Sequence, residues 1–221
     1  MRVAIFDVDG TLIKSDCTII AARKSNTLIN LIVGLSRLIP WFLFWKIKLI
    51  KTDRFKEHFL RIFKVCEKFN KENGKNNKEW LLNDLKKNIN SEALKRLNYH
   101  KNNGDLVFLC SASPQMIIEP LANWLKVDLI CTNLDTNNGL WEPKIKGKNC
   151  NGKEKVRRLI NKIGNKEDIF IESYGDSIGD KEILNYSSIP HYRSFTNSPK
   201  AYPKFSLFPI LSITSIALLS Y

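Results

Sequence analysis

The stretch Val3–Thr11, VAIFDVDGT, decides the fold of this chain. Val3–Phe6 is a short apolar run that stops at an acidic turn, as a buried strand does where it meets a polar loop. Asp7 and Asp9 are two residues apart, so in extended backbone both carboxylates face the same side. Such a pair suits a divalent metal ion, or a nucleophile with an acid–base partner. A plain acidic turn has the same pattern, so this motif alone does not settle the chemistry.

Three later segments repeat this pattern of an apolar run followed by a polar loop, with helical patterns between them. Strands that alternate with helices predict an α/β fold with a Rossmann-like central parallel sheet. In such a sheet the loops at the carboxyl ends of the strands converge on one crevice. The expected elements are strands at Leu106–Leu109, Val127–Cys131 and Ile169–Ile171, and helices at Pro114–Leu125 and Lys155–Ile163.

The interval between the first two predicted strands has no strand pattern and is far too long for one crossover helix. We therefore expect residues 16–103 to form an inserted all-helical cap. It should lie above the crevice, because it leaves from the loop after the first strand. Residues 1–15 and 104–200 would form the catalytic core, and residues 201–221 an apolar tail.

Two segments are unusually apolar. Leu28–Trp45 contains one charge, Arg37, and Phe205–Tyr221 contains none. Each is near the lower limit of about 17–25 apolar residues for a spanning helix, and Pro40 is expected to break the first. Aromatic residues followed by lysines favour an interfacial helix for the first segment. Both segments could equally be buried faces of a soluble fold.

The composition is that of a folded, basic protein. The 35 Lys and Arg residues exceed the 22 Asp and Glu residues, which gives a net charge of +13 and favours anionic partners such as phosphorylated substrates or an anionic membrane surface. Nucleic acid is not expected, because the aromatic residues cluster in apolar runs. Five scattered cysteines without ligand spacing argue against zinc or a disulfide framework. The N-terminus has no secretory signal, so we expect a cytoplasmic protein.

A second group of acids, Asp176 and Asp180, follows another predicted strand. Asp176 could complete a metal site, and Asp180, one helical turn on, could face the same crevice. Either Asp176 or Ser177 could instead cap the following helix, although capping does not explain two acids framed by glycines.

Ser111 lies between a strand and a predicted helix, where its hydroxyl and nearby amides would form an anion site. Ser113 has the position of a helix cap. Lys155 opens another helix, where a cation opposes the dipole, so an anion such as a phosphate is expected to hold it there. Lys153 is the competing candidate for this lysine.

In chain order, four motifs together resemble the haloacid dehalogenase superfamily of aspartate-nucleophile phosphatases: DVDGT at residues 7–11, SAS at 111–113, GKEK at 152–155 and GDSIGD at 175–180. The resemblance extends from Val3 to about Phe195, and Thr11 indicates the phosphatase branch. The helical insertion resembles subfamily IB, which contains phosphoserine phosphatase. Details around the second, third and fourth motifs resemble the phosphatidylglycerophosphatase C branch.

The resemblance implies a role for each motif residue. Asp7 would be the nucleophile, and Asp9 would protonate the leaving oxygen and later deprotonate water. Mg²⁺ would be held by Asp7, the main-chain carbonyl of Asp9, and Asp176.

The transferring phosphoryl group would be bound by Thr11, Ser111 and Lys155. Asp180 would support the site by positioning Lys155 or a water at the magnesium ion. These cations and amides are needed because phosphoryl transfer spreads negative charge over the equatorial oxygens.

The expected substrate follows from the cap. Ile39–Trp45 is aromatic and flanked by lysines, which suits a lipid phosphate presented at a membrane surface, with phosphatidylglycerophosphate as the leading candidate. The enzyme would then be peripheral to, or anchored at, the inner face of the membrane. The alternatives are a soluble phosphatase of the phosphoserine phosphatase type and a non-catalytic, membrane-associated binding module.

Overall fold

A computed structural model describes residues 1–71, 78–164 and 169–195 of this chain. Its centre is a five-stranded parallel sheet with the strand order β3-β2-β1-β6-β7. A two-stranded antiparallel hairpin, β4-β5, forms a second sheet. The strands are β1 (Arg2–Phe6), β2 (Leu106–Pro114), β3 (Asp128–Thr132), β4 (Leu134–Asn137), β5 (Leu140–Ile145), β6 (Phe170–Gly175) and β7 (Ile189–Tyr192).

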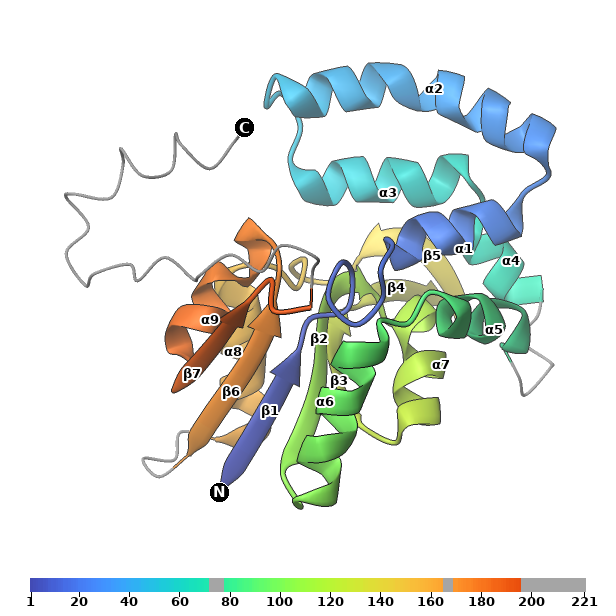
Figure 1. Cartoon of the computed structure of the whole chain (residues 1–221). Helices are drawn as coiled ribbons and strands as arrows, with labels where there is room; N and C mark the ends of the chain where they lie inside the picture. The colour runs from blue at the N-terminus through green and yellow to red at the C-terminus, as the bar shows by residue number, and fades with distance from the viewer. Residues whose placement is uncertain (72–77, 165–168, 196–221) are drawn as a thin grey trace.

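Helices cover both faces of the large sheet, as the alternating sequence pattern requires (Figure 1). On β1, Val3 and Ile5 pack toward one core cluster while Ala4 and Phe6 pack toward the other, so the central strand is buried on both faces. The core helices are α6 (Ser91–Asn102) and α7 (Gln115–Leu125) on one face, and α8 (Lys153–Ile163), the short 3-10 helix η1 (Ile178–Asp180) and α9 (Lys181–Tyr186) on the other.

The remaining helices lie above the carboxyl ends of the strands, with α2 outermost and α3 beneath it (Figure 1). They are α1 (Cys17–Ser25), α2 (Leu28–Lys46), α3 (Thr52–Ile62), α4 (Val65–Lys71) and α5 (Glu79–Lys87). The hairpin packs against α3 and α4, whereas α6 packs against β1 and β2. From these contacts we propose that the core resumes at α6, earlier than residue 104.

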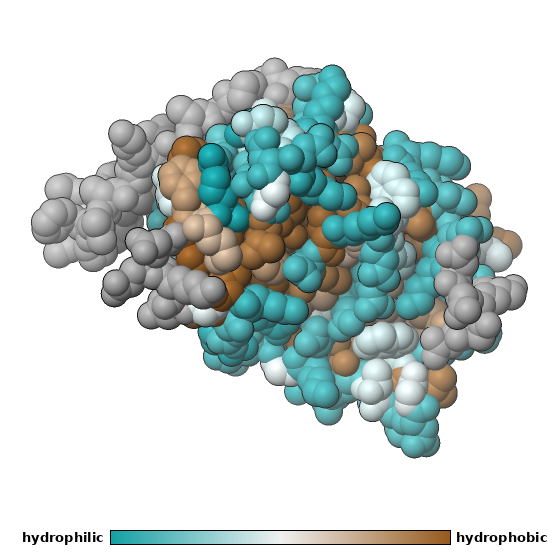
Figure 2. All heavy atoms as spheres, turned by 90° about the horizontal axis from the view of Figure 1, so that it is seen from below, coloured by the Kyte–Doolittle hydropathy of each residue, from teal (hydrophilic) through white to brown (hydrophobic). Residues whose placement is uncertain are grey.

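The opposite face of the molecule lies at the amino ends of the strands. Seen from below, hydrophobic residues gather in the middle of this face and hydrophilic residues surround them (Figure 2). The two faces therefore differ: the amino ends of the strands lie on one, and the loops that carry the acids lie on the other.

The predicted α/β fold with a central parallel sheet is confirmed. One local prediction was wrong: Pro40 does not break the apolar segment, because α2 runs through it from Leu28 to Lys46. Proline removes a single backbone hydrogen bond, and Pro40 is exposed, where water can satisfy the released carbonyl. The expectations for residues 196–221, including the apolar tail, lie outside the described residues.

Candidate active site

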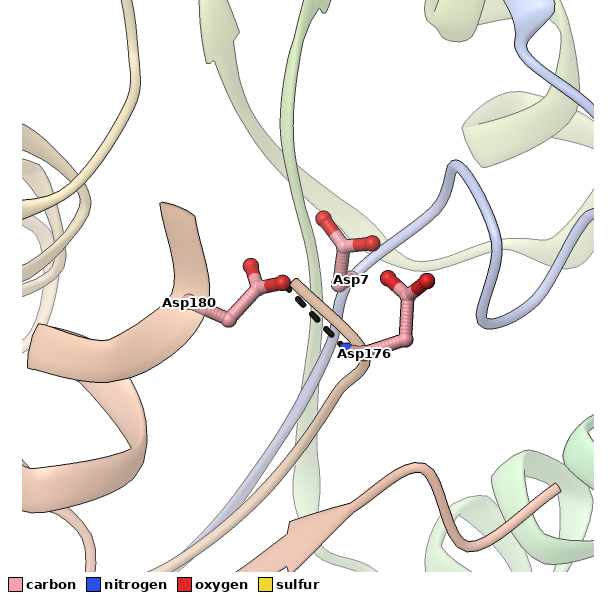
Figure 3. A group of neighbouring side chains, drawn as sticks. All are labelled: Asp7, Asp176 and Asp180. Atoms are coloured by element: carbon pink, nitrogen blue, oxygen red, sulfur yellow. Dashed lines mark hydrogen bonds between the residues drawn. The ribbon is translucent and has the colours of Figure 1, made fainter. Parts of the chain in front are cut away.

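Asp7 and Asp176 lie side by side because their strands are neighbours in the sheet. Phe6 on β1 is opposite Tyr174 on β6, and the Asp7 N–H donates to the Tyr174 carbonyl at 2.8 Å. Each acid is the first residue after its strand, at the carboxyl edge of the sheet. Their carboxylates point into the same space, and Asp180 approaches from the helical side (Figure 3).

Lys155 is the cation of this cluster. Its Nζ donates to Asp7 Oδ1 at 2.6 Å, to Asp180 Oδ1 at 2.5 Å and to the Cys110 carbonyl at 2.9 Å. Lys155 is 2% exposed and Asp180 is fully buried, so the three charged groups interact with little screening by water. This geometry favours Lys155 over Lys153, which is exposed two residues earlier on α8.

Asp180 is fixed by both of its oxygens. While Oδ1 accepts from Lys155, Oδ2 accepts from the Ser177 hydroxyl at 2.7 Å and the Ser177 N–H at 3.0 Å. The side chains of Ser177 and Asp180 thereby form a capping box, so the capping interpretation explains part of this motif. The capping box uses Oδ2 alone, so Oδ1 of Asp180 also holds the buried lysine in place.

The turn after β1 shapes the space for Asp176. Gly10 has φ +84°, and a Cβ there would lie 2.3 Å from Asp176 Oδ2. The buried hydroxyl of Thr11 donates to Asp176 Oδ1 at 3.5 Å. The Thr11 side chain, predicted to bind phosphate, therefore lies against Asp176.

Asp9 is held by three donors. Oδ2 accepts from the hydroxyls of Ser111 at 3.0 Å and Ser113 at 2.8 Å, and Oδ1 accepts from the Cys17 N–H at 2.7 Å. The interpretation of Ser113 as a helix cap was wrong, because Pro114 occupies the N-cap of α7 and Ser113 turns to Asp9 instead. Sequence reasoning thus missed Ser113 as a site residue, although it lies in the same SAS motif as Ser111.

The cap contributes a second lysine that the sequence analysis did not select. Lys56 on α3 donates to the Ala112 carbonyl at 2.9 Å and to Asn149 Oδ1 at 3.0 Å. Burial lowers the pKa of Lys56, and the nearby Asp9 and Asp16 offset part of that effect. Lys56 is one of many lysines at helical spacing, so only the packing of the cap on the core distinguishes it.

Three carboxylates among the described residues could hold a metal ion: one oxygen each from Asp7, Asp176 and Asp180 lies within 4.8 Å of the others. Hard oxygen donors are the ligands that Mg²⁺ prefers. Three acids against the one positive charge of Lys155 leave an excess of negative charge, which a divalent cation would offset. Because Asp180 is already bound through both oxygens, Asp7 and Asp176 are the better ligands. The residues present therefore fit Mg²⁺.

The electrostatics agree with this assignment. Burial raises the pKa of Asp7 well above its ordinary value, and Asp180 adds to that effect while Lys155 opposes it. Burial also raises the pKa of Asp176. For Lys155, burial favours loss of the proton, but Asp7 and Asp180 outweigh it and raise the pKa. The lysine is therefore protonated, and a further cation would favour the ionised form of both acids.

A family model described as haloacid dehalogenase-like hydrolase matches residues 4–185. Among curated proteins, Protein CicA of two Caulobacter vibrioides strains (NA1000 / CB15N and ATCC 19089 / CIP 103742 / CB 15) is 35% identical over 99 residues. That alignment covers 43% of this chain and 44% of each relative, so less than half of the relatives' length is matched.

Solved structures share the fold over most of the chain. A Bordetella pertussis Tohama I protein of unknown function has a TM-score of 0.63 at 17% identity, with 86% of this chain and 88% of that chain covered. A phosphoserine phosphohydrolase-like protein from Francisella tularensis has a TM-score of 0.56 at 16% identity, with 87% and 86% covered. A phosphoserine phosphatase determined as a phospho-aspartyl intermediate analogue has a TM-score of 0.52 at 15% identity, with 85% and 84% covered. The family model confirms the expected family and a hydrolase, and the solved structures confirm the fold.

Proposed function

This chain belongs to the haloacid dehalogenase-like hydrolases, and we propose that it is a Mg²⁺-dependent phosphatase that hydrolyses phosphate monoesters through an aspartyl-phosphate on Asp7. The observation that carries this proposal is the cluster of buried Asp7, Lys155 and Asp180 with half-buried Asp176 at the carboxyl edge of the sheet. Mg²⁺, held by Asp7, the Asp9 carbonyl and Asp176, would supply charge that offsets the repulsion between Asp7 and the phosphate.

In the first step an Asp7 oxygen forms a bond to phosphorus while the bond from phosphorus to the ester oxygen breaks. Asp9 gives its proton to that leaving oxygen. In the second step Asp9 takes a proton from water, whose oxygen attacks phosphorus and releases phosphate from Asp7. Ser111, Ser113 and the Cys17 N–H hold Asp9 in position, and Lys155 balances the charge on the equatorial oxygens.

The substrate we propose is a lipid phosphate, for which α2 gives the support. A single stripe of α2, formed by Leu31, Gly34, Leu38 and Trp41, packs on the rest of the cap. Gly34 lies so close to Phe63 that a Cβ would come within 2.5 Å of the ring. Most of the remaining helix surface is also apolar, apart from Asn30, Ser36 and Arg37, and a helix that only covers a soluble cap would not need this.

The exposed apolar residues of α2 extend along the whole helix: Leu28 is 73%, Ile32 60% and Leu43 54% exposed. By length and composition α2 could cross a membrane, and 11% of its apolar window is buried, unlike the core helix of a soluble protein. An apolar face followed by lysines fits the boundary of an anionic membrane. We therefore propose that the enzyme is peripheral to the inner face of the membrane. We also propose that it belongs to subfamily IB and is nearest the phosphatidylglycerophosphatase C branch.

The first experiment tests the enzyme. Release of phosphate from p-nitrophenyl phosphate should require Mg²⁺ and should be absent in Asp7→Asn, which keeps the size of the side chain. If wild-type protein releases no phosphate at any Mg²⁺ concentration, the chain is a binding module and the proposed activity is wrong.

The second experiment tests the substrate class. Phosphatidylglycerophosphate in neutral mixed micelles is expected to be hydrolysed with a higher kcat/KM than phosphoserine. A preference for phosphoserine would replace the lipid proposal by a soluble phosphatase, which the structural likeness to phosphoserine phosphatases equally supports. Replacing exposed Ile32 and Leu35 by Glu should lower sedimentation with anionic vesicles and leave p-nitrophenyl phosphate turnover unchanged.

A further inference from the structure

A basic cavity of about 1010 Å³ lies between the cap and the core. The cap lines it with the end of α2 and the turn into α3, and the core lines it with the loop before α8 and the first turns of that helix. Lysines come from both sides: Lys46, Lys48, Lys51, Lys148 and Lys153.

The cavity carries excess positive charge. Glu154, one of its two acidic residues, is already neutralised by Arg157 at 2.6 Å and Arg158 at 2.8 Å, which help to hold its pKa at about 2. In the part of the chain that the structure describes, the five lysines form no ion pair. Five like charges around one cavity repel one another, and an anion between them would relieve that repulsion.

One residue of the cavity wall, Asn149, connects the cavity to the residues around Asp9. Asn149, which is buried, accepts hydrogen bonds from Thr132 at 2.9 Å and from Lys56 at 3.0 Å. Lys56 also binds the carbonyl of Ala112, between the two serines that hold Asp9. Asn149, on the cavity wall, is therefore connected to the proposed acid–base residue through Lys56 and the segment that carries the two serines.

The outer end of the cavity meets the apolar surface of α2. Trp45, in the last turn of α2, lines the cavity and stacks on Phe55 with ring centroids 5.2 Å apart. Ile47 and Leu49, in the turn that follows, are 64% and 69% exposed. An anionic headgroup with its chains at the α2 surface would thus cross this cavity to reach Asp7.

We propose that the basic cavity binds the phosphodiester of a glycerophospholipid whose headgroup ends in the phosphate monoester that is hydrolysed. The inference rests on the proposed phosphatase activity and narrows its substrate class. A lipid with only a terminal monoester would leave the lysines unmatched, because its one phosphate is occupied at Asp7. Selection for the diester therefore comes from the lysines of both the cap and the core.

The test compares full-length wild type with the triple variant Lys48→Glu, Lys51→Glu, Lys148→Glu. The first substrate is the deacylated headgroup glycerophosphoglycerol phosphate, which has a diester and a monoester but no acyl chains. Loss of the charge-assisted contacts is expected to raise its KM at least about tenfold, with kcat changed by less than about twofold. Turnover of p-nitrophenyl phosphate should stay the same. A matched control replaces exposed lysines elsewhere and should leave KM and turnover unchanged for both substrates; its substitutions are Lys71→Glu, Lys87→Glu and Lys95→Glu.

Two results would overturn the inference. If the triple variant lost as much activity on p-nitrophenyl phosphate as on the headgroup, the lysines would support the active site in general and would not bind the diester. An unchanged KM for the headgroup, with equal losses on micellar phosphatidylglycerophosphate and phosphatidic acid, would mean that they attract an anionic surface. Wild-type turnover of p-nitrophenyl phosphate reports the phosphatase itself, so failure of the diester site is distinguishable from failure of the proposed function.

Discussion

The Nζ atom of Lys155 lies 2.6 Å from Oδ1 of Asp7, and both side chains are buried. The same nitrogen lies 2.5 Å from Asp180, so one lysine joins the acid that follows the central strand β1 to the last residue of the helix η1. This ion pair links stability to chemistry, because the cation that would bind the phosphoryl group also allows the acids to be buried.

Lys155→Met is expected to lower both activity and stability. Two buried acids would lose their cation, at a cost of about 3–5 kcal/mol in the free energy of unfolding. Turnover of p-nitrophenyl phosphate should fall at least about 100-fold. Urea unfolding and steady-state kinetics measure the two effects. The control is Lys162→Met, at an exposed position on the same helix, which should change neither turnover nor the free energy of unfolding. A Lys155→Met variant as stable and active as wild type would contradict the role of the ion pair.

Ser113→Ala tests the unexpected hydrogen bond to Asp9. Loss of the 2.8 Å contact should reduce kcat about tenfold on an alkyl phosphate, whose poor leaving group needs a proton from Asp9. The loss on p-nitrophenyl phosphate should be smaller, because that leaving group departs without protonation. Thr18→Val removes the other partner of Ser113 and is the control. Equal losses on both esters would indicate a structural role only.

Gly10→Ala should weaken Mg²⁺ binding. The added methyl group would displace Asp176, so the Mg²⁺ concentration for half-maximal activity should rise at least about tenfold, since each 1.4 kcal/mol is tenfold. Gly104→Ala is the matched control: Gly104 also has a positive φ, +76°, but has nothing within 4 Å of the added atom. Titration of EDTA-treated protein with Mg²⁺ measures the difference. If both variants need the same Mg²⁺ concentration for half-maximal activity, backbone strain alone explains the effect.

Glu172 makes the fold sensitive to acid. Burial on its own would raise the pKa of Glu172, but hydrogen bonds from His191, Tyr174, Arg96 and Arg2 hold it at about 2, below its ordinary value of 4.5. The unfolded chain therefore takes up this proton first as the pH falls. The stabilisation is complete above about pH 4.5 and is lost between pH 4.5 and 2.

The corresponding variant is Glu172→Gln. It should lower the free energy of unfolding at pH 7 by about 2 kcal/mol and flatten its decline below pH 4.5. Urea unfolding across this pH range measures both effects. The control is Glu92→Gln, at an exposed pair with Lys95, which should have the acid profile of wild type. An unchanged profile in Glu172→Gln would show that other carboxylates set the acid limit.

The sequence predicted the parts of the site that lie next to the strands. Asp7 and Asp176 follow apolar runs, and parallel strands bring such positions to one edge of a sheet. It did not predict Lys56 or Ser113. Lys56 lies on a cap helix far along the chain from its partners, and the rotamer of Ser113 depends on Asp9. No local sequence pattern predicts either contact.

The order of apolar runs and acidic turns by itself determined the parallel sheet, the crevice and the acids that line it, because side-chain alternation and strand ends are local properties. Only the tertiary structure decided which lysine neutralises those acids, that α2 continues through Pro40, and that lysines from cap and core surround one cavity. These features depend on how helices distant in the sequence pack together, since burial and pairing of charge are set by neighbours in space.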